Sequence, residues 1–164
     1  SHGQHRGILK SNFKDDRENL INSISKKIKI NGFGYNKSDP IWGSVFFYEL
    51  LKCKMGLNLS RGNPVKHYSS DRIASLLGNG LLTFINEDYK FSDFFKKDEI
   101  IFYSSIDELN NKLEYYSKNN IERSKIAQKG HVKAHQIFNN KLITKYMICK
   151  IFNIKNNDNY SWMI

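Results

Sequence analysis

The sequence predicts an α/β protein built on a Rossmann-like parallel sheet of about five strands with flanking helices. Strand-like and helix-like stretches alternate along the chain, which is the order that a parallel sheet requires. The run at residues 81–85 is apolar on both faces, as expected of a central parallel strand. The 164 residues are 40% apolar, which is enough for one domain with a buried core.

Three strands and two helices are expected in the first sixty residues. Leu20, Ile21 and Ile24 recur at helical spacing. Ile28 and Ile30 alternate instead with polar neighbours, which is typical of a half-buried strand. In chain order we expect a strand at 7–11, a helix opened by Asp15 and Asp16, a strand at 27–32, a short helix at 44–52 and a strand at 55–59.

The rest of the chain continues the alternation and ends in helices. Ser69 or Ser70 can cap a helix that stops at two glycines after Leu77. Ser105 and Glu108 have the spacing of a capping box and open a later helix. The other expected elements are strands at 81–85 and 100–103, an aromatic segment at 89–95, helices at 121–136 and 141–152, and a polar, frayed tail from 153, with docking of Trp162 as the alternative.

The net charge of +10 has two interpretations. Only five of the 26 basic residues are Arg, and the Lys are scattered among acids, so a Lys, Asn and Ile surplus from an AT-rich genome is the simpler one. A basic surface for an anionic ligand or a membrane is the other. No apolar run approaches the roughly 18 residues that span a bilayer. Two cysteines cannot form a disulfide framework, which favours a reducing, cytoplasmic setting.

Several common motifs are absent. Gly32 and Gly34 follow an expected strand, but Lys37 stands where a dinucleotide fingerprint has its third glycine. His131 and His135 lie four apart on one helix without a third ligand nearby, so we expect a solvated helix face and no metal. Neither a P-loop nor the Gly-x-Ser-x-Gly motif of hydrolases occurs.

The most informative window surrounds the start of the helix near residue 70. Ser69 and Ser70 precede this helix, whose first amide groups favour an anion such as a diphosphate. Lys66 and Arg72 bring positive charge to the same end, and ligands of parallel sheets bind at the carboxyl ends of the strands. A well-capped structural helix with basic neighbours explains the same residues equally well.

This window also resembles a known family. Residues 72–83 are similar to the arginine, glutamate, small-residue and glycine signature of GT-B glycosyltransferases, in particular of the group called glycosyl transferases group 1 or CgeB-like. Residues 11–17 resemble the first strand-to-helix loop of the donor domain in that fold. The resemblance covers about residues 7–150 and includes the segments 93–103, 106–109 and 122–130.

The resemblance implies a donor site. It implies that a sugar moves from a nucleotide diphosphate to an unknown acceptor, in a hexosyltransferase type of reaction that needs neither metal nor cofactor. Retaining members of the wider fold often carry two glutamates eight apart, and His67 and Ser75 stand at these positions, which leaves the sugar and the stereochemical outcome open. Asp71 or the Ser75 hydroxyl is the alternative group for the sugar and ribose hydroxyls. The residues implied to bind the nucleotide sugar are Arg17, Lys66, Tyr68, Ser69, Ser70, Arg72 and Ser75, and the resemblance assigns no catalytic residue.

The resemblance also implies a second domain. GT-B enzymes react in a cleft between two Rossmann-like halves, so an N-terminal acceptor-binding domain is the expected partner and this chain alone is expected to be inactive. Residues 1–3 are interpreted as an expression scar, 4–152 as the nucleotide-sugar-binding domain and 153–164 as a tail. We expect a cytoplasmic location, a peripheral membrane contact through the acceptor, and no nucleic-acid partner.

Two other classes of function stay open. A small basic α/β module would bind nucleic acid or an anionic surface without chemistry, and the aromatic and basic segment 89–97 supports that interpretation. A pure interaction domain with a degenerate pocket would explain the absent glutamates. Equal, salt-dependent binding of any polyanion would distinguish the basic module from a donor site.

Overall fold

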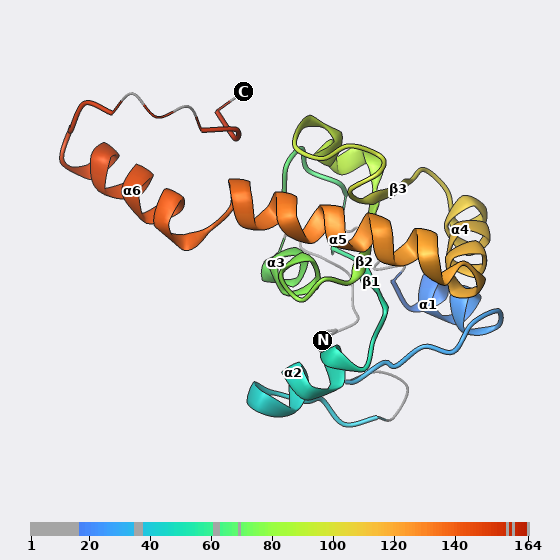
Figure 1. The fold of residues 1–164 in the computed structure, drawn as a ribbon. Helices are drawn as coiled ribbons and strands as arrows, with labels where there is room; N and C mark the ends of the chain where they lie inside the picture. Colours follow the sequence, from blue (N-terminus) through green and yellow to red (C-terminus); the bar gives the residue numbers. More distant parts are fainter. Residues whose placement is uncertain are drawn as a thin grey trace.

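The computed structural model describes residues 17–34, 38–60, 63–68, 70–156, 158 and 160–163. Its centre is a parallel sheet in the order β1-β2-β3, made of β1 (Met55–Asn58), β2 (Leu82–Asn86) and β3 (Ile101–Tyr103). Leu82 of β2 lies beside Met55 of β1, and Phe84 lies beside Ile101 of β3. Helices flank this sheet, so the expected Rossmann-like α/β class is confirmed (Figure 1).

The strand count differs from the expectation, because the described sheet has three strands and not about five. Residues 7–11 lie outside the described part of the chain. The strand expected at 27–32 is wrong, because these residues form a turn and coil after the first helix. The alternation of Ile28 and Ile30 does not mark a strand: Ile28 packs against the core cluster of β2, α1 and α4, Ile30 is 36% exposed, and neither belongs to a paired strand.

The helices agree with the sequence to within one or two residues at most of their ends. α1 begins at Arg17, while Asp15 and Asp16, expected to open it, lie outside the described residues. In chain order the helices are α1 (Arg17–Ser25), α2 (Gly43–Leu51), α3 (Asp71–Gly78), the short 3₁₀ helices η1 (Glu87–Tyr89) and η2 (Phe91–Asp93), α4 (Ile106–Lys118), α5 (Asn120–Ile137) and α6 (Asn140–Ile151).

The two faces of β2 pack against different helices. Leu82 and Phe84 are fully buried in a cluster with side chains of α1 and α4. Ile85 is also fully buried, in a second cluster that includes Ile73 and Leu77 of α3. Because neighbouring side chains of a strand point to opposite faces, β2 is buried on both. The expectation of a central strand at 81–85 is therefore confirmed.

Polar caps set the starts of two later helices. The Ser105 hydroxyl accepts a hydrogen bond from the Glu108 amide at 3.2 Å, so the capping interaction expected for α4 is confirmed. The Glu108 carboxylate accepts from the Ser104 amide, one residue earlier than a standard capping box would have it. Asn139 caps α6 by accepting from the Leu142 amide at 3.0 Å. Both helices thus begin where a polar side chain can bond their first amides.

α5 crosses the domain and leads into α6 (Figure 1). It packs on α3 and β2, and its Gly130 is buried where an added Cβ would meet the Glu99 carbonyl oxygen. Glycine is therefore required for the close approach of α5 to the start of β3. The Trp162 ring stacks on Phe138 with ring centres 6.0 Å apart, so the alternative in which Trp162 docks is confirmed. None of the described helices combines the length and the hydrophobicity that crossing a membrane requires.

Candidate functional site

The carboxyl ends of the strands and the N-terminus of α3 lie together at one edge of the sheet. β1 ends at Asn58 and is followed by Leu59 and Ser60. Arg72, in the first turn of α3, donates from its guanidinium to the Leu59 carbonyl oxygen. This contact holds the start of α3 against the end of β1, which is where ligands bind in open parallel sheets.

Two guanidinium groups lie within electrostatic reach of each other at this edge. Burial lowers the pKa of Arg72, and repulsion from Arg17, the first residue of α1, lowers it further. Asp71 acts in the opposite direction and raises that pKa. Like charges held close together beside a helix N-terminus, which itself favours negative charge, form an arrangement suited to an anion.

Two buried polar side chains at the end of β1 have no hydrogen-bond partner within the described part of the chain. Neither the nitrogen nor the oxygen of the Asn58 amide is bonded, although this residue is 0% exposed, and the Ser60 hydroxyl is also unbonded. An unmade hydrogen bond of this kind costs about 1–3 kcal/mol. Buried groups of this kind are therefore rare and call for an explanation, such as a water or a ligand.

The alternation of side chains along β1 indicates that Asn58 lies on the α3 side of the sheet. Gly56 lies two residues earlier on the same side of β1, and its position is in contact with Leu76 of α3. Because α3 follows a parallel strand and runs back along it, a residue further along β1 faces an earlier turn of the helix. Asn58 and Ser60 were not among the site residues expected from the sequence. A polar residue that ends an otherwise apolar strand was the signal that would have found Asn58.

The loop before α3 turns two of its side chains toward η2. His67 Nε2 lies 2.8 Å from the Asp93 carboxylate, and Lys66 Nζ lies 3.5 Å from the same oxygen. The hydrogen bond from His67 is the main reason why the pKa of Asp93 is lowered, with Lys66 adding to it. The charge of Lys66 is therefore paired with a carboxylate of the protein, whereas Arg72 bonds a neutral carbonyl group.

The remaining residues selected from the sequence have different surroundings. Tyr68 is 50% exposed. Ser70 is half-buried at the N-cap position of α3, although its side chain does not cap the helix. The Ser75 hydroxyl donates to the Asp71 carbonyl oxygen at 3.2 Å, within its own helix. Ser69 lies outside the described residues. The structure thus brings the two arginines together and gives Ser75 a partner inside α3.

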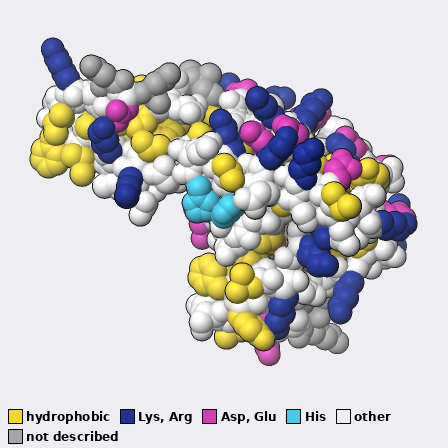
Figure 2. Space-filling view, viewed as in Figure 1, with side chains coloured by type: hydrophobic (Ala, Val, Ile, Leu, Met, Phe, Trp, Pro, Cys, Tyr) yellow, Lys and Arg dark blue, Asp and Glu magenta, His cyan; other side chains and the backbone are white. Residues whose placement is uncertain are grey.

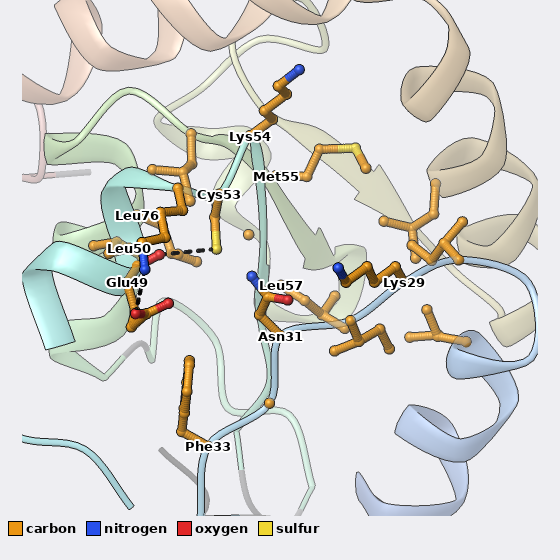
Figure 3. A pocket seen from close by; sticks show the side chains of 18 of the residues that line it. Lys29, Asn31, Phe33, Glu49, Leu50, Cys53, Lys54, Met55, Leu57 and Leu76 are labelled. Carbon is orange, nitrogen blue, oxygen red and sulfur yellow. Dashed lines mark hydrogen bonds and ion pairs between the residues drawn. The ribbon is translucent and has the colours of Figure 1, made fainter. Parts of the chain in front are cut away.

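A groove of about 590 Å³ runs along β1 and reaches Arg72 (Figure 3). Its walls come from α1, α2, the segment 29–33 and β1, and its lining is mostly apolar, with Met55 and Leu57 among the labelled side chains. Burial raises the pKa of the Cys53 thiol in this wall. A mostly apolar cleft of this volume with a few polar groups is typical of a site for a small organic ligand.

The aromatic segment 89–97 does not form an exposed stacking surface. Tyr89, Phe91 and Phe95 are 2–5% exposed and belong to the hydrophobic core. Phe94 packs on the His67 ring, with ring centres 4.6 Å apart. Proteins that bind single-stranded nucleic acid stack bases on exposed aromatic faces. This segment therefore gives no support to the interpretation as a nucleic-acid-binding module.

The two histidines of α5 contact the C-terminal end of α3. His131 Nδ1 lies 2.9 Å from the Leu77 carbonyl oxygen, and His135 Nε2 lies 3.4 Å from that of Gly78. They therefore contact the last carbonyls of α3 and are not simply a solvated face. Among the residues that the structure describes, no three His, Cys, Asp or Glu side chains are grouped as metal ligands.

Residues 16–146 match a family described as glycosyl transferase-like. This span covers most of the chain and includes both arginines, the three strands and the helices from α1 to α5. No curated protein and no solved structure matches the chain. Because the family match extends over far more than half of the sequence and over the whole described sheet, the chain belongs to the glycosyl transferase-like family.

Proposed function

We propose that this chain is the donor-binding half of a GT-B glycosyltransferase, which moves a hexose from a nucleotide diphosphate to an acceptor. The observation that carries this proposal is that Arg72, beside the N-terminus of α3, lies within electrostatic reach of the positive charge of Arg17. Breaking the sugar–phosphate bond leaves negative charge on the diphosphate. Cations and amide groups that are already in place stabilise such charge without reorganisation.

Each part of the site has a role in this proposal. Arg17 and Arg72 neutralise the diphosphate, so no metal ion is required. Asn58 and Ser60 supply the buried polar atoms that lack partners in the described chain. The groove along β1 takes the nucleoside, because Arg72 is among its lining residues and the lining is mostly apolar. Lys66, Tyr68, Ser69, Ser70 and Ser75 border the site in the sequence and are proposed contacts of the sugar or the ribose.

The acceptor belongs to a second domain in this proposal. Transfer requires both reactants to be held in near-attack geometry, and that positioning can contribute about 7–11 kcal/mol to catalysis. A donor domain alone keeps the groups that bind the nucleotide but lacks those that hold the acceptor. The proposed setting is the cytoplasm, where nucleotide sugars are available as donors.

Titration of the chain with UDP, GDP and ADP tests the donor site. We expect binding with a Kd of about 0.1–10 mM, unchanged by EDTA, and stronger for a diphosphate than for the free nucleoside. Arg17→Ala should weaken it more than tenfold, because one of the two cations is lost. Lys125→Ala, an exposed lysine on α5, is the matched control for loss of one positive charge.

The residues whose amide signals shift, and the range of anions that cause the shift, distinguish a donor site from a general basic surface. Amide signals of residues 58–60 and 70–75 should shift on titration if the nucleotide binds at the end of β1. Equal responses to heparin, polyphosphate and nucleoside diphosphates, all lost at moderate salt, would instead favour a non-catalytic basic module.

A further inference from the structure

α6 contributes no buried side chain to the hydrophobic core. None of its twelve residues is buried, and five large apolar side chains on it or just after it are 38–70% exposed. Figure 1 shows α6 projecting away from the sheet beyond the end of α5. The five residues, which we call the α6 apolar strip, are Ile143, Met147, Ile148, Ile151 and Phe152.

The α6 apolar strip is continuous on one side of the helix. Ile143, Met147 and Ile151 are spaced four residues apart, so they form one row along the helix surface. Ile148 and Phe152 form the neighbouring row. At 100° per residue, Lys150 lies beside the first row, whereas Lys141 continues the second row toward the start of α6, so the strip has one lysine at its side and one at its end. Figure 2 shows hydrophobic side chains gathered at the far end of α6, with basic side chains next to them.

The chain's own tail covers a different side of α6. The Tyr146 ring contacts Tyr160 and Trp162, with ring centres 5.0 Å and 6.0 Å apart. Lys145 forms an ion pair with Asp158 at 2.7 Å. The described part of the tail therefore returns along the Tyr146 side and leaves the α6 apolar strip exposed.

Charge indicates which surface the strip fits. From Arg123 to Asn157 the sequence contains eight Lys or Arg and no Asp or Glu. A second copy of the chain would bring the same positive charge to the contact. α2 also exposes apolar side chains, including Phe47 and Leu51, but it carries Glu49 and no basic residue within its bounds. On α6, exposed apolar side chains lie together with Lys141 and Lys150, and no residue within its bounds is acidic.

We propose that the α6 apolar strip docks on an anionic lipid surface. An interfacial helix inserts apolar side chains at the level of the headgroups while flanking lysines contact anionic lipids. Met147, Ile151 and Phe152 would enter the interface, and Lys141 and Lys150 would contact headgroup phosphates. The projecting position of α6 allows a flat surface to reach it (Figure 1). This inference does not depend on the proposed donor site.

Flotation of the chain with lipid vesicles tests the inference. We expect binding to phosphatidylcholine vesicles that contain phosphatidylglycerol, at least tenfold weaker binding to phosphatidylcholine alone, and a decrease with salt. The double variant Ile151→Ser, Phe152→Ser should lose at least tenfold, as should Lys141→Gln, Lys150→Gln. The matched controls are Ile121→Ser, which removes an 89% exposed isoleucine at the start of α5, and Lys97→Gln. Both should bind as the wild type does.

A depth measurement gives a second readout that does not depend on loss of binding. Tryptophan fluorescence of Met147→Trp should be quenched by brominated lipid, and that of Ile121→Trp should not, after subtraction of the wild-type signal. The inference is wrong if anionic vesicles bind the α6 variants as well as the wild type, or if the wild type does not bind them. Concentration-dependent dimerisation that the α6 variants abolish, without vesicle binding, would assign the strip to a second copy and also overturn it.

Discussion

At the scale of single residues, Arg72 makes two interactions that Lys66 does not make. Its guanidinium bonds the Leu59 carbonyl and so connects α3 to β1, and it also lies within reach of the charge of Arg17. Arg provides several donors in a planar fork, which allows one guanidinium to bond a carbonyl and an anion together. Lys66 has a single ammonium group, which is mostly exposed and paired with Asp93.

Replacement of these two residues should therefore have different effects. Arg72→Ala should weaken nucleoside-diphosphate binding more than tenfold and lower the free energy of unfolding by about 1–3 kcal/mol, because the Leu59 carbonyl loses its donor. Lys66→Ala should change stability by less than about 1 kcal/mol, since its ion pair is exposed, and should weaken binding less than Arg72→Ala does. Calorimetric titration and urea unfolding measure the two quantities. A larger loss of affinity in Lys66→Ala would place the diphosphate at Asp93 and not at Arg17.

At the scale of elements, the start of α4 depends on one carboxylate. Glu108 accepts hydrogen bonds from the amide and the hydroxyl of Ser104, at 2.8 Å and 2.6 Å, and pairs with Lys112 at 2.6 Å. These contacts, with the Lys112 hydrogen bond largest, lower the pKa of Glu108 from 4.5 to about 2. Because the folded state favours the ionised form, this contribution to stability is complete above the unfolded pKa and is lost as the pH falls through 4.5 toward 2.

The pH dependence of Glu108→Gln should show this contribution. At pH 7 the variant should have a lower free energy of unfolding than the wild type. This difference should shrink between pH 5 and about pH 2, because the Glu108 carboxylate of the wild type becomes protonated in that range. The effect will be reduced by solvent, since the carboxylate is 38% exposed. Urea unfolding at several pH values measures it, with Glu87→Gln on η1 as the control. A difference that stays constant with pH would show that the loss comes from helix capping geometry and not from charge.

β2 is the element whose packing supports the whole site. Leu82 is fully buried between the sheet and α1 and α4, so Leu82→Ala should leave a cavity and lower the free energy of unfolding by about 2–5 kcal/mol. Thermal and urea unfolding check this value. Exposed Leu51 on α2 is the matched control, and Leu51→Ala should cost much less. Equal losses in the two variants would contradict the central position of β2.

At the scale of the whole molecule, the donor site and the α6 apolar strip belong to different parts of the chain. The proposed donor site requires a second domain for chemistry, so we expect this chain to bind nucleotide sugars without transferring the sugar. Product formation with UDP-, GDP- and ADP-sugars and a panel of lipid and protein acceptors, with and without EDTA, measures this. Transfer by these residues alone would show that the acceptor site lies within this chain.

Local patterns in the sequence predicted most of the elements, and the exceptions have physical causes. Residues 27–32 alternate like a strand, but alternation only shows that every second side chain is apolar, and here Ile28 packs against the core cluster without any strand pairing. His131 and His135 fit a solvated helix face equally well in the sequence, yet they contact the last carbonyls of α3. In both cases the residues that these side chains contact are remote in the chain, so spacing in the sequence alone could not identify them.

The fold class, the central strand and the residues that bring positive charge to α3 could be predicted from the sequence, because periodicity, caps and residue type are local properties. Which of those charges lie near one another depends on how the chain packs. The tertiary structure placed Arg17 near Arg72, paired Lys66 with Asp93, turned the Ser75 hydroxyl to its own helix and left Asn58 buried without a described partner. The reason is geometric, since these contacts join residues from separate elements whose distances are set by the packing of helices on the sheet.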